Sequence, residues 1–283
     1  MTGPDRGGGD AVLSLRDAGL VLGGHQLWSG LDLDVAPGEF VAVLGANGSG
    51  KTSLLKTVLG EHQLTQGEGT LLGEPLRRGD RRIGYIPQHR LPDDTLLLRG
   101  RDLVGLGLDG HRWGLGLPTA ARRRRVDELL DAVGAAHYAR VPVIKLSGGE
   151  QQRLRVGQAL AGDPSLLLCD EPLSSLDLHA QRVVTELIDR HRRERGFGVL
   201  FVTHDVNPIL DQVDRVLYLA NHRFRIGTPD EVLRSEVLSE LYRSPVEVVR
   251  AGGRLVIVGA PDEHHAHEPH DHERRDHSSE AAS

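Results

Sequence analysis

One eight-residue segment constrains this chain more than any other: Gly45-Ala46-Asn47-Gly48-Ser49-Gly50-Lys51-Thr52. It fits the G-x-x-x-x-G-K-[ST] pattern and stands between an apolar run that predicts a strand, Val41 to Leu44, and a predicted helix, Lys51 to Leu59. Its glycines let backbone N–H groups point at phosphate oxygens, and a helix N-terminus adds favourable partial charge. The segment therefore predicts an ATP phosphate loop in an α/β fold, with Lys51 at the β- and γ-phosphates and Thr52 at Mg²⁺.

A second apolar run, Leu166 to Cys169, ends in Asp170-Glu171-Pro172. Ligands of parallel α/β sheets bind at the carboxyl ends of the strands, so both carboxylates are expected near the phosphate loop. Adjacent side chains of a strand point to opposite sides, which suits two different roles. We expect Asp170 to contact Mg²⁺ and its waters, and Glu171 to act as the general base on the attacking water.

A third motif, Leu146-Ser147-Gly148-Gly149-Glu150, places a serine and two glycines at the start of a helix rich in Gln and Arg. This is a second helix N-terminus suited to an anion. One nucleotide does not need two such cradles. The simplest interpretation is that the second cradle serves a nucleotide held mainly by another copy of the chain.

In this order the motifs strongly resemble those of the ATP-binding cassette (ABC) ATPases, in which two cassettes sandwich two ATP molecules head to tail. The family's signature motif is LSGGQ or a close variant such as LSGGE. The resemblance covers about residues 11–228. It implies that Gln88 is the Q-loop glutamine, which touches Mg²⁺ and the attacking water and flanks the surface gripped by a membrane partner. It also implies that Ser175-Leu176-Asp177 is the D-loop at the dimer interface and that His204 lies near the γ-phosphate.

One position departs from the family's pattern. These cassettes commonly carry an aromatic residue before the phosphate loop that stacks on adenine, and Leu22 occupies that place here. Trp28 or His25 is a possible substitute, although neither stands at the expected position. Adenine recognition is therefore the part of the site that the sequence defines least.

The remaining sequence predicts an α/β fold. Apolar strands alternate with helical patterns after Ser165, as in a parallel sheet with helices on its faces, and short β-like runs precede the phosphate loop. We predict a P-loop NTPase core with a mainly parallel sheet and flanking helices, an N-terminal antiparallel β patch and an inserted helical subdomain. The predicted ABC ATPase domain spans 11–260, with the helical subdomain at about 90–160 inserted in its RecA-like core. Residues 1–10 are expected to form a flexible N-terminus and 261–283 a disordered His- and acid-rich tail.

Composition narrows the setting in which the chain works. The longest apolar stretches, such as Gly198 to Val202, are far short of the roughly 20 residues that cross a bilayer, and no secretory signal is evident. The single cysteine, Cys169, fits a reducing cytosol. The net charge of −6 comes with no broad basic face, so we expect no nucleic-acid partner.

Two features favour metal transport. The stretch Thr203-His204-Asp205-Val206-Asn207-Pro208 resembles one in cassettes of the zinc/manganese importer group, and Gly105 to Leu117 is also similar to that group. Independently, six of the 15 histidines lie close together near the C-terminus, among acidic residues: His264, His265, His267, His270, His272 and His277. Neutral imidazoles at such spacing in a flexible chain can bind Zn²⁺. The alternative is a solvated tail that binds nothing.

The leading hypothesis is an ATP-hydrolysing subunit that energises transmembrane transport, most simply import, of a divalent metal ion (Zn or Mn, with Fe a further option). It would work as a homodimer of cassettes, peripheral on the cytoplasmic face of the cell membrane. Integral permease subunits and an extracytoplasmic metal-binding protein are its expected partners. The alternatives are a cassette for a siderophore or an exported compound, and a soluble ABC ATPase without a transport role.

Overall fold

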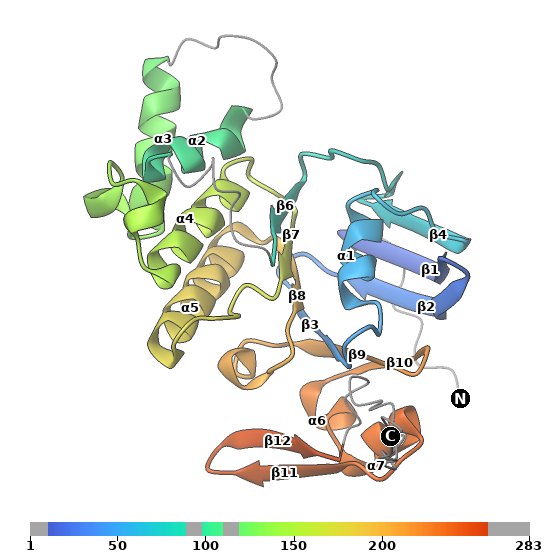
Figure 1. Ribbon diagram of the computed structural model, residues 1–283. Helices are drawn as coiled ribbons and strands as arrows, with labels where there is room; N and C mark the ends of the chain where they lie inside the picture. Colours follow the sequence, from blue (N-terminus) through green and yellow to red (C-terminus); the bar gives the residue numbers. More distant parts are fainter. Residues whose placement is uncertain (1–10, 89–97, 110–118, 260–283) are drawn as a thin grey trace, which may run out of the picture.

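A six-stranded sheet forms the centre of the computed structural model, which describes residues 11–88, 98–109 and 119–259 (Figure 1). The strand order is β10-β9-β3-β8-β7-β6; five strands are mutually parallel, and only the edge strand β10 runs antiparallel to its neighbour. This confirms the predicted α/β class. The strands are β3 (Phe40–Gly45), β6 (Ile83–Ile86), β7 (Leu166–Asp170), β8 (Gly198–Val202), β9 (Arg215–Ala220) and β10 (Arg223–Gly227).

A separate antiparallel sheet lies beside this core, in the order β2-β1-β4-β5. Its strands are β1 (Leu13–Leu22), β2 (His25–Val35), β4 (Gln66–Leu71) and β5 (Glu74–Pro75). The first two strands are longer than the sequence predicts. They form one hairpin around Gly23 and Gly24, whose φ angles of 58° and 81° suit a tight turn that continues the twist of the strands.

Helices cover both faces of the central sheet (Figure 1). On one side α2, α3 and α4 pack on one another, and α4 also contacts α5 and β6; α1 packs against β3 and β7. Polar side chains fix where the helices begin, because Thr119, Ser147 and Asp177 each accept a hydrogen bond from the first turn that follows. The helices are α1 (Lys51–Val58), α2 (Gly100–Asp109), α3 (Ala120–Ala132), α4 (Gly148–Leu160) and α5 (Leu178–Arg195).

Side-chain alternation along β3 builds two cores. Phe40, Ala42 and Leu44 join the cluster under the helices, whereas Val41 and Val43 join the cluster that β3 shares with the antiparallel sheet and α1. A strand buried on both faces needs apolar residues at every position, which explains the unbroken run in this sequence. The phosphate loop thus leaves the sheet from a strand that is packed on both faces.

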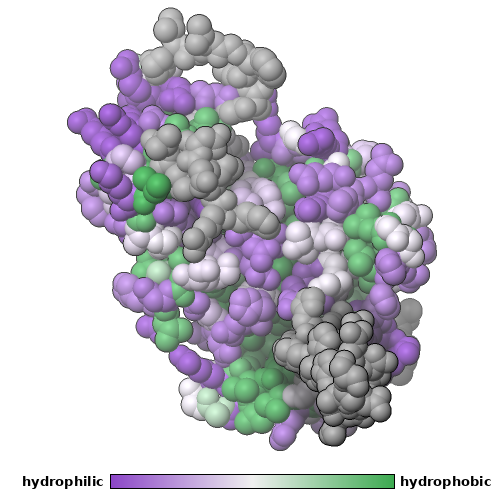
Figure 2. All heavy atoms as spheres, viewed as in Figure 1, coloured by the Kyte–Doolittle hydropathy of each residue, from purple (hydrophilic) through white to green (hydrophobic). Residues whose placement is uncertain are grey.

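The C-terminal part adds two short helices and a hairpin to the β9–β10 side of the core: α6 (Pro229–Val232), α7 (Ser235–Tyr242), β11 (Glu247–Ala251) and β12 (Arg254–Val258). The sequence predicts one helical segment from Pro229 to Tyr242, but the chain breaks it at Leu233 and Arg234, which leave helical geometry. Across the described ranges, none of the helices has the length and apolar character that crossing a membrane requires. On the face drawn in Figure 2, hydrophilic residues predominate and hydrophobic residues form separate patches.

Candidate functional site

The phosphate loop connects β3 to α1 at the carboxyl end of the central strand. Lys51 folds back over it and donates to the carbonyls of Gly45 and Ala46, both at 2.8 Å. The side chain is only 7% exposed, and burial lowers the pKa of its amine. A buried ammonium whose hydrogen bonds go to loop carbonyls favours an anion beside it, so the loop suits phosphate oxygens.

Asp170 and Thr52 meet at the end of β7. The Thr52 hydroxyl donates to Asp170 Oδ1 at 3.1 Å, and the Tyr85 hydroxyl lies 3.5 Å from Oδ2. Asp170 is 2% exposed, and burial raises the pKa of its carboxyl. A buried carboxylate beside a hydroxyl presents the oxygen ligands that Mg²⁺ prefers, and a cation there would offset the cost of burying the charge. The residues present therefore fit the predicted metal.

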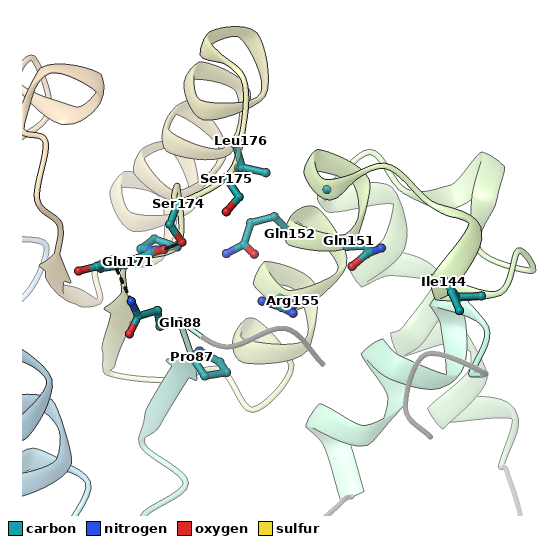
Figure 3. A pocket seen from close by; sticks show the side chains of 12 residues that line it. Pro87, Gln88, Ile144, Gln151, Gln152, Arg155, Glu171, Ser174, Ser175 and Leu176 are labelled. Atoms are coloured by element: carbon teal, nitrogen blue, oxygen red, sulfur yellow. Dashed lines mark hydrogen bonds between the residues drawn. The ribbon is translucent and has the colours of Figure 1, made fainter. Parts of the chain in front are cut away.

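Glu171 turns away from Asp170 and lies with Gln88 and His204. Gln88 Nε2 donates to Glu171 Oε2 at 3.0 Å (Figure 3), and His204 Nδ1 lies 3.7 Å from the same oxygen. The side chains of Asp170 and Glu171 diverge as expected, although alternation along a strand is not the cause. Glu171 lies just past β7 with a φ of 45°, and its N–H donates to the Val202 carbonyl at 3.0 Å. Two predicted site residues, Gln88 and His204, are thereby brought to one carboxylate oxygen of a third, Glu171.

The signature segment forms a second cradle at the start of α4. Ser147 and Glu150 make a reciprocal capping box, with the Ser147 N–H donating to Glu150 Oε2 at 2.8 Å. A hollow beside it is lined by the signature residues 147–150 together with the D-loop residues Ser175, Leu176 and Asp177. The described residues that line it include none from the phosphate loop. Figure 1 also shows α4 apart from α1, so the two cradles of one chain are separate features.

A larger groove, which we call the Gln88 groove, runs between Glu171 and α4 (Figure 3). Its lining includes Gln88, Ile144, Gln152, Arg155 and Glu171. Arg155 is 8% exposed, yet it makes no hydrogen bond or ion pair with any residue in the described ranges, and burial lowers the pKa of its guanidinium. Sequence reasoning did not single out this residue, although a charge within the apolar run Leu154-Arg155-Val156 is a usable signal.

The structure narrows the choice of an adenine-stacking group. Trp28 is fully buried: a Cβ on Gly50 would lie 3.0 Å from its ring, so the indole supports the phosphate loop from beneath. It offers no free ring face, and the possibility that it replaces the missing aromatic is not supported. Leu22 ends β1 directly opposite His25, which is exposed. Of the two possible substitutes for the missing aromatic, His25 stays a prediction.

The predicted metal-binding tail cannot be placed. All six of its histidines, from His264 to His277, lie outside the described residues, as do residues 110–117 of the segment Gly105 to Leu117. Within residues 11–88, 98–109 and 119–259, the side chains that could hold a metal ion never gather into a group of three His, Cys, Asp or Glu.

Comparison with known proteins assigns the family. Residues 28–174 match the family model described as "ABC transporter". The chain is 35% identical to the zinc import ATP-binding protein ZnuC of Chelativorans sp., over 93% of this chain and 83% of that protein. It is 37% identical to that of Brucella abortus (93% and 78%) and 34% identical to that of Alcanivorax borkumensis (82% and 84%).

Solved structures agree with this assignment. A chain of a metal-chelate-type ABC transporter in an inward-facing conformation is similar with a TM-score of 0.74 and 27% identity, over 88% of this chain and 96% of that chain. The cbiO1 protein of Clostridium perfringens, at 24% identity and a TM-score of 0.70, shares the fold over 82% of this chain and 94% of its own. The chain therefore belongs to the ABC transporter family, as an ATP-binding ATPase subunit.

Proposed function

We propose that this chain hydrolyses ATP to drive import of a divalent metal ion, with zinc as the first choice of cargo. The choice of zinc as the cargo is supported by the similarity to zinc import ATP-binding proteins, which extends over 82–93% of the chain and not only over the nucleotide motifs. The site geometry supports the motor: one hydroxyl–carboxylate pair and one cluster around Glu171 lie at the carboxyl ends of parallel strands.

The proposed roles follow from the contacts. Residues 45–50 and Lys51 bind the phosphates, which replace the carbonyls that now accept from the lysine. Thr52, Asp170 and Gln88 would hold Mg²⁺, which when bound neutralises charge on the phosphates.

Glu171 takes the proton of the attacking water in this proposal, and His204 supports the γ-phosphate. Each site is completed by the residues Leu146 to Glu150 and the D-loop of a partner cassette, because this chain's own signature faces a different hollow.

The Gln88 groove is the surface we propose for the membrane permease. Arg155 is buried and has no partner among the described residues, which is costly for a charged group, and a carboxylate brought by another subunit would remove that cost. Ile144, 56% exposed at the rim, offers an apolar contact beside it. The occupant would be a cytoplasmic segment of the permease that carries an acidic side chain next to an apolar one. A separate extracytoplasmic protein would deliver the metal to the same permease.

A transport experiment tests the cargo and its direction. Cells that depend on this chain are compared with cells carrying Glu171→Gln or the matched control Glu186→Gln, whose side chain is exposed on α5. Removal of a general base is expected to slow hydrolysis at least about a hundredfold. Cellular zinc should therefore fall with Glu171→Gln and stay normal with Glu186→Gln. Unchanged zinc, manganese and iron with Glu171→Gln would refute metal import, and a rise in zinc would indicate export.

A second cargo, a chelated metal, is favoured by one observation: the similarity to a transporter of the metal-chelate type. Uptake of radioactive zinc, offered either free or as a chelate, separates the two. Uptake of the free ion that stops with Glu171→Gln supports the first proposal. Uptake of the chelate alone supports the second.

A further inference from the structure

Asn207 joins the loop that carries His204 to the C-terminal hairpin. Its side-chain amide donates to the Leu255 carbonyl in β12 at 2.9 Å, and its oxygen accepts from the Leu255 N–H at 2.7 Å. A side-chain amide carries the same donor and acceptor as a peptide group, so this two-way pairing resembles a rung of a β-ladder. Leu255 lies opposite Arg250 of β11 and directs its peptide groups outward. Asn207 thus satisfies the free edge of β12.

The same side chain also fixes its own loop. Its second amide hydrogen is donated to Asp205 Oδ1 at 2.7 Å, and the backbone N–H of Asn207 donates to the same oxygen at 2.9 Å. Asp205 in turn is bonded to Thr203, whose hydroxyl donates to the Asp205 carbonyl at 2.9 Å and accepts from its N–H at 3.2 Å. These bonds hold the backbone on both sides of His204. Both amide hydrogens and the oxygen of Asn207 are used, so a flipped amide would lose all three bonds.

His204 depends on that backbone for its position. Its side chain is 64% exposed, and its distance of 3.7 Å to Glu171 is longer than a hydrogen bond. Its ring is therefore not held by close packing. Between the loop and the hairpin, the buried side chains of Val206 and Leu255 line a common apolar hollow with His204. A shift of the hairpin would therefore displace the loop that carries His204.

The hairpin is suited to act as a brace because its other strand is anchored elsewhere. The Val248 N–H in β11 donates to the Ser235 hydroxyl at 2.9 Å, and Arg250 of the same strand pairs with Asp230 of α6. A two-stranded hairpin is marginally stable alone. This one is held by α6 and α7 on the β11 side and by Asn207 on the β12 side.

We propose that Asn207 is a positioning residue for ATP hydrolysis, and that through it the hairpin β11–β12 serves as a brace for the His204 loop. The proposal rests on the role given to His204 under the proposed function. Asn207 does not touch the nucleotide in this proposal. Its effect passes entirely through the placement of His204.

The test compares ATP hydrolysis and thermal unfolding of the full chain in five forms: wild type, Asn207→Ala, Asn207→Asp, His204→Ala and the double variant Asn207→Ala/His204→Ala. Asn221→Ala is the matched control, because Asn221 clamps the Leu241 and Tyr242 carbonyls at 3.1 and 3.0 Å in the same C-terminal part but has no bond to the His204 loop. Asn207→Asp keeps the shape and the acceptor for Leu255 while losing both amide donors, and so guards against a folding defect in the alanine variant.

We expect kcat to fall about tenfold in both Asn207 variants, with KM for ATP within about twofold. Asn207→Asp loses two side-chain hydrogen bonds and Asn207→Ala loses three, which displaces His204 and leaves the phosphate loop intact. Asn221→Ala should keep its kcat within about twofold. In the His204→Ala background, Asn207→Ala should have no further effect, since coupled residues are not additive.

Three results would overturn the proposal: wild-type kcat in both Asn207 variants, an equal fall in Asn221→Ala, or additive losses in the double variant. Wild-type hydrolysis by His204→Ala is a different failure. It would refute the role of His204 in the proposed function, and the bracing role of Asn207 with it.

Discussion

A single methyl group on Gly45 should disable the phosphate loop. Gly45 is the last residue of β3, has a φ of 144° and pairs with Leu219 of β9. An added Cβ would lie 2.0 Å from the Leu219 carbonyl oxygen, more than 1 Å inside an ordinary contact between carbon and oxygen. Either β9 or the loop must move. Backbone strain of about 1–3 kcal/mol and overpacking of about 1–3 kcal/mol together predict a loss of about 2–6 kcal/mol in the free energy of unfolding.

Thermal unfolding and titration with a fluorescent ATP analogue measure this effect. Gly45→Ala should lower Tm by about 4–24 °C, from the usual 2–4 °C per kcal/mol for a chain near this size, and should weaken nucleotide binding at least about tenfold. The control is Gly73→Ala in the β4–β5 turn, where φ is also positive, at 78°, but a Cβ meets nothing within 4 Å. It should cost only about 1–2 kcal/mol and leave ATP affinity unchanged. Equal Tm and affinity in the two variants would show that the close approach of β9 does not fix the loop.

Three further measurements address other parts of the site. Burial raises the pKa of Asp170, so the stability associated with its protonated form is lost as pH rises through that pKa. Asp170→Asn should therefore abolish hydrolysis but raise the Tm of the nucleotide-free chain at pH 7, by an amount that shrinks toward pH 4. A lowered Tm at pH 7 would contradict this. Leu22→Tyr should tighten ATP binding severalfold if an adenine stack is missing, whereas unchanged affinity in an equilibrium titration would mean that another group supplies the contact. Calorimetry should detect weak, multi-site Zn²⁺ binding that is lost on truncation after Pro261; equal binding by the truncated chain would exclude the histidine-rich tail.

Much of the fold could be predicted from local sequence, and the exceptions have physical causes. The runs Phe40 to Leu44 in β3, Leu166 to Cys169 in β7 and Val199 to Val202 in β8 are apolar at every position because both sheet faces are covered. These strands, and the motifs at their ends, can therefore be recognised from the sequence. By contrast, β4 reads Gln-Gly-Glu-Gly-Thr-Leu, is mostly exposed and is held by pairing with β1, so its strand character comes from a partner far away in sequence. The strand order of the central sheet also depends on pairing between segments far apart in the sequence, which local patterns do not predict.

The site shows the same limit at the level of single residues. Motif spacing predicts Thr52 beside Asp170, because both follow strands of one parallel sheet, and the structure places them 3.1 Å apart. It does not predict that Trp28 lies beneath the phosphate loop, which depends on the packing of two sheets. Nor does it predict that Asn207, read in the sequence as a mark of cargo, makes its bonds to a strand 48 residues away.

Gln88 links the surface proposed for the permease to the proposed general base. Its amide donates to Glu171 Oε2 at 3.0 Å, and the same side chain lines the groove that holds Arg155. While this bond is made, one lone pair of the carboxylate is directed at an amide and not at water. A carboxylate that entered the groove to pair with Arg155 would compete for the space next to Gln88, and displacement of the amide would free Glu171 for water. Docking of the permease and exposure of the base are therefore expected to be coupled through one side chain, and a cassette without its permease should hydrolyse ATP more slowly than the assembled transporter.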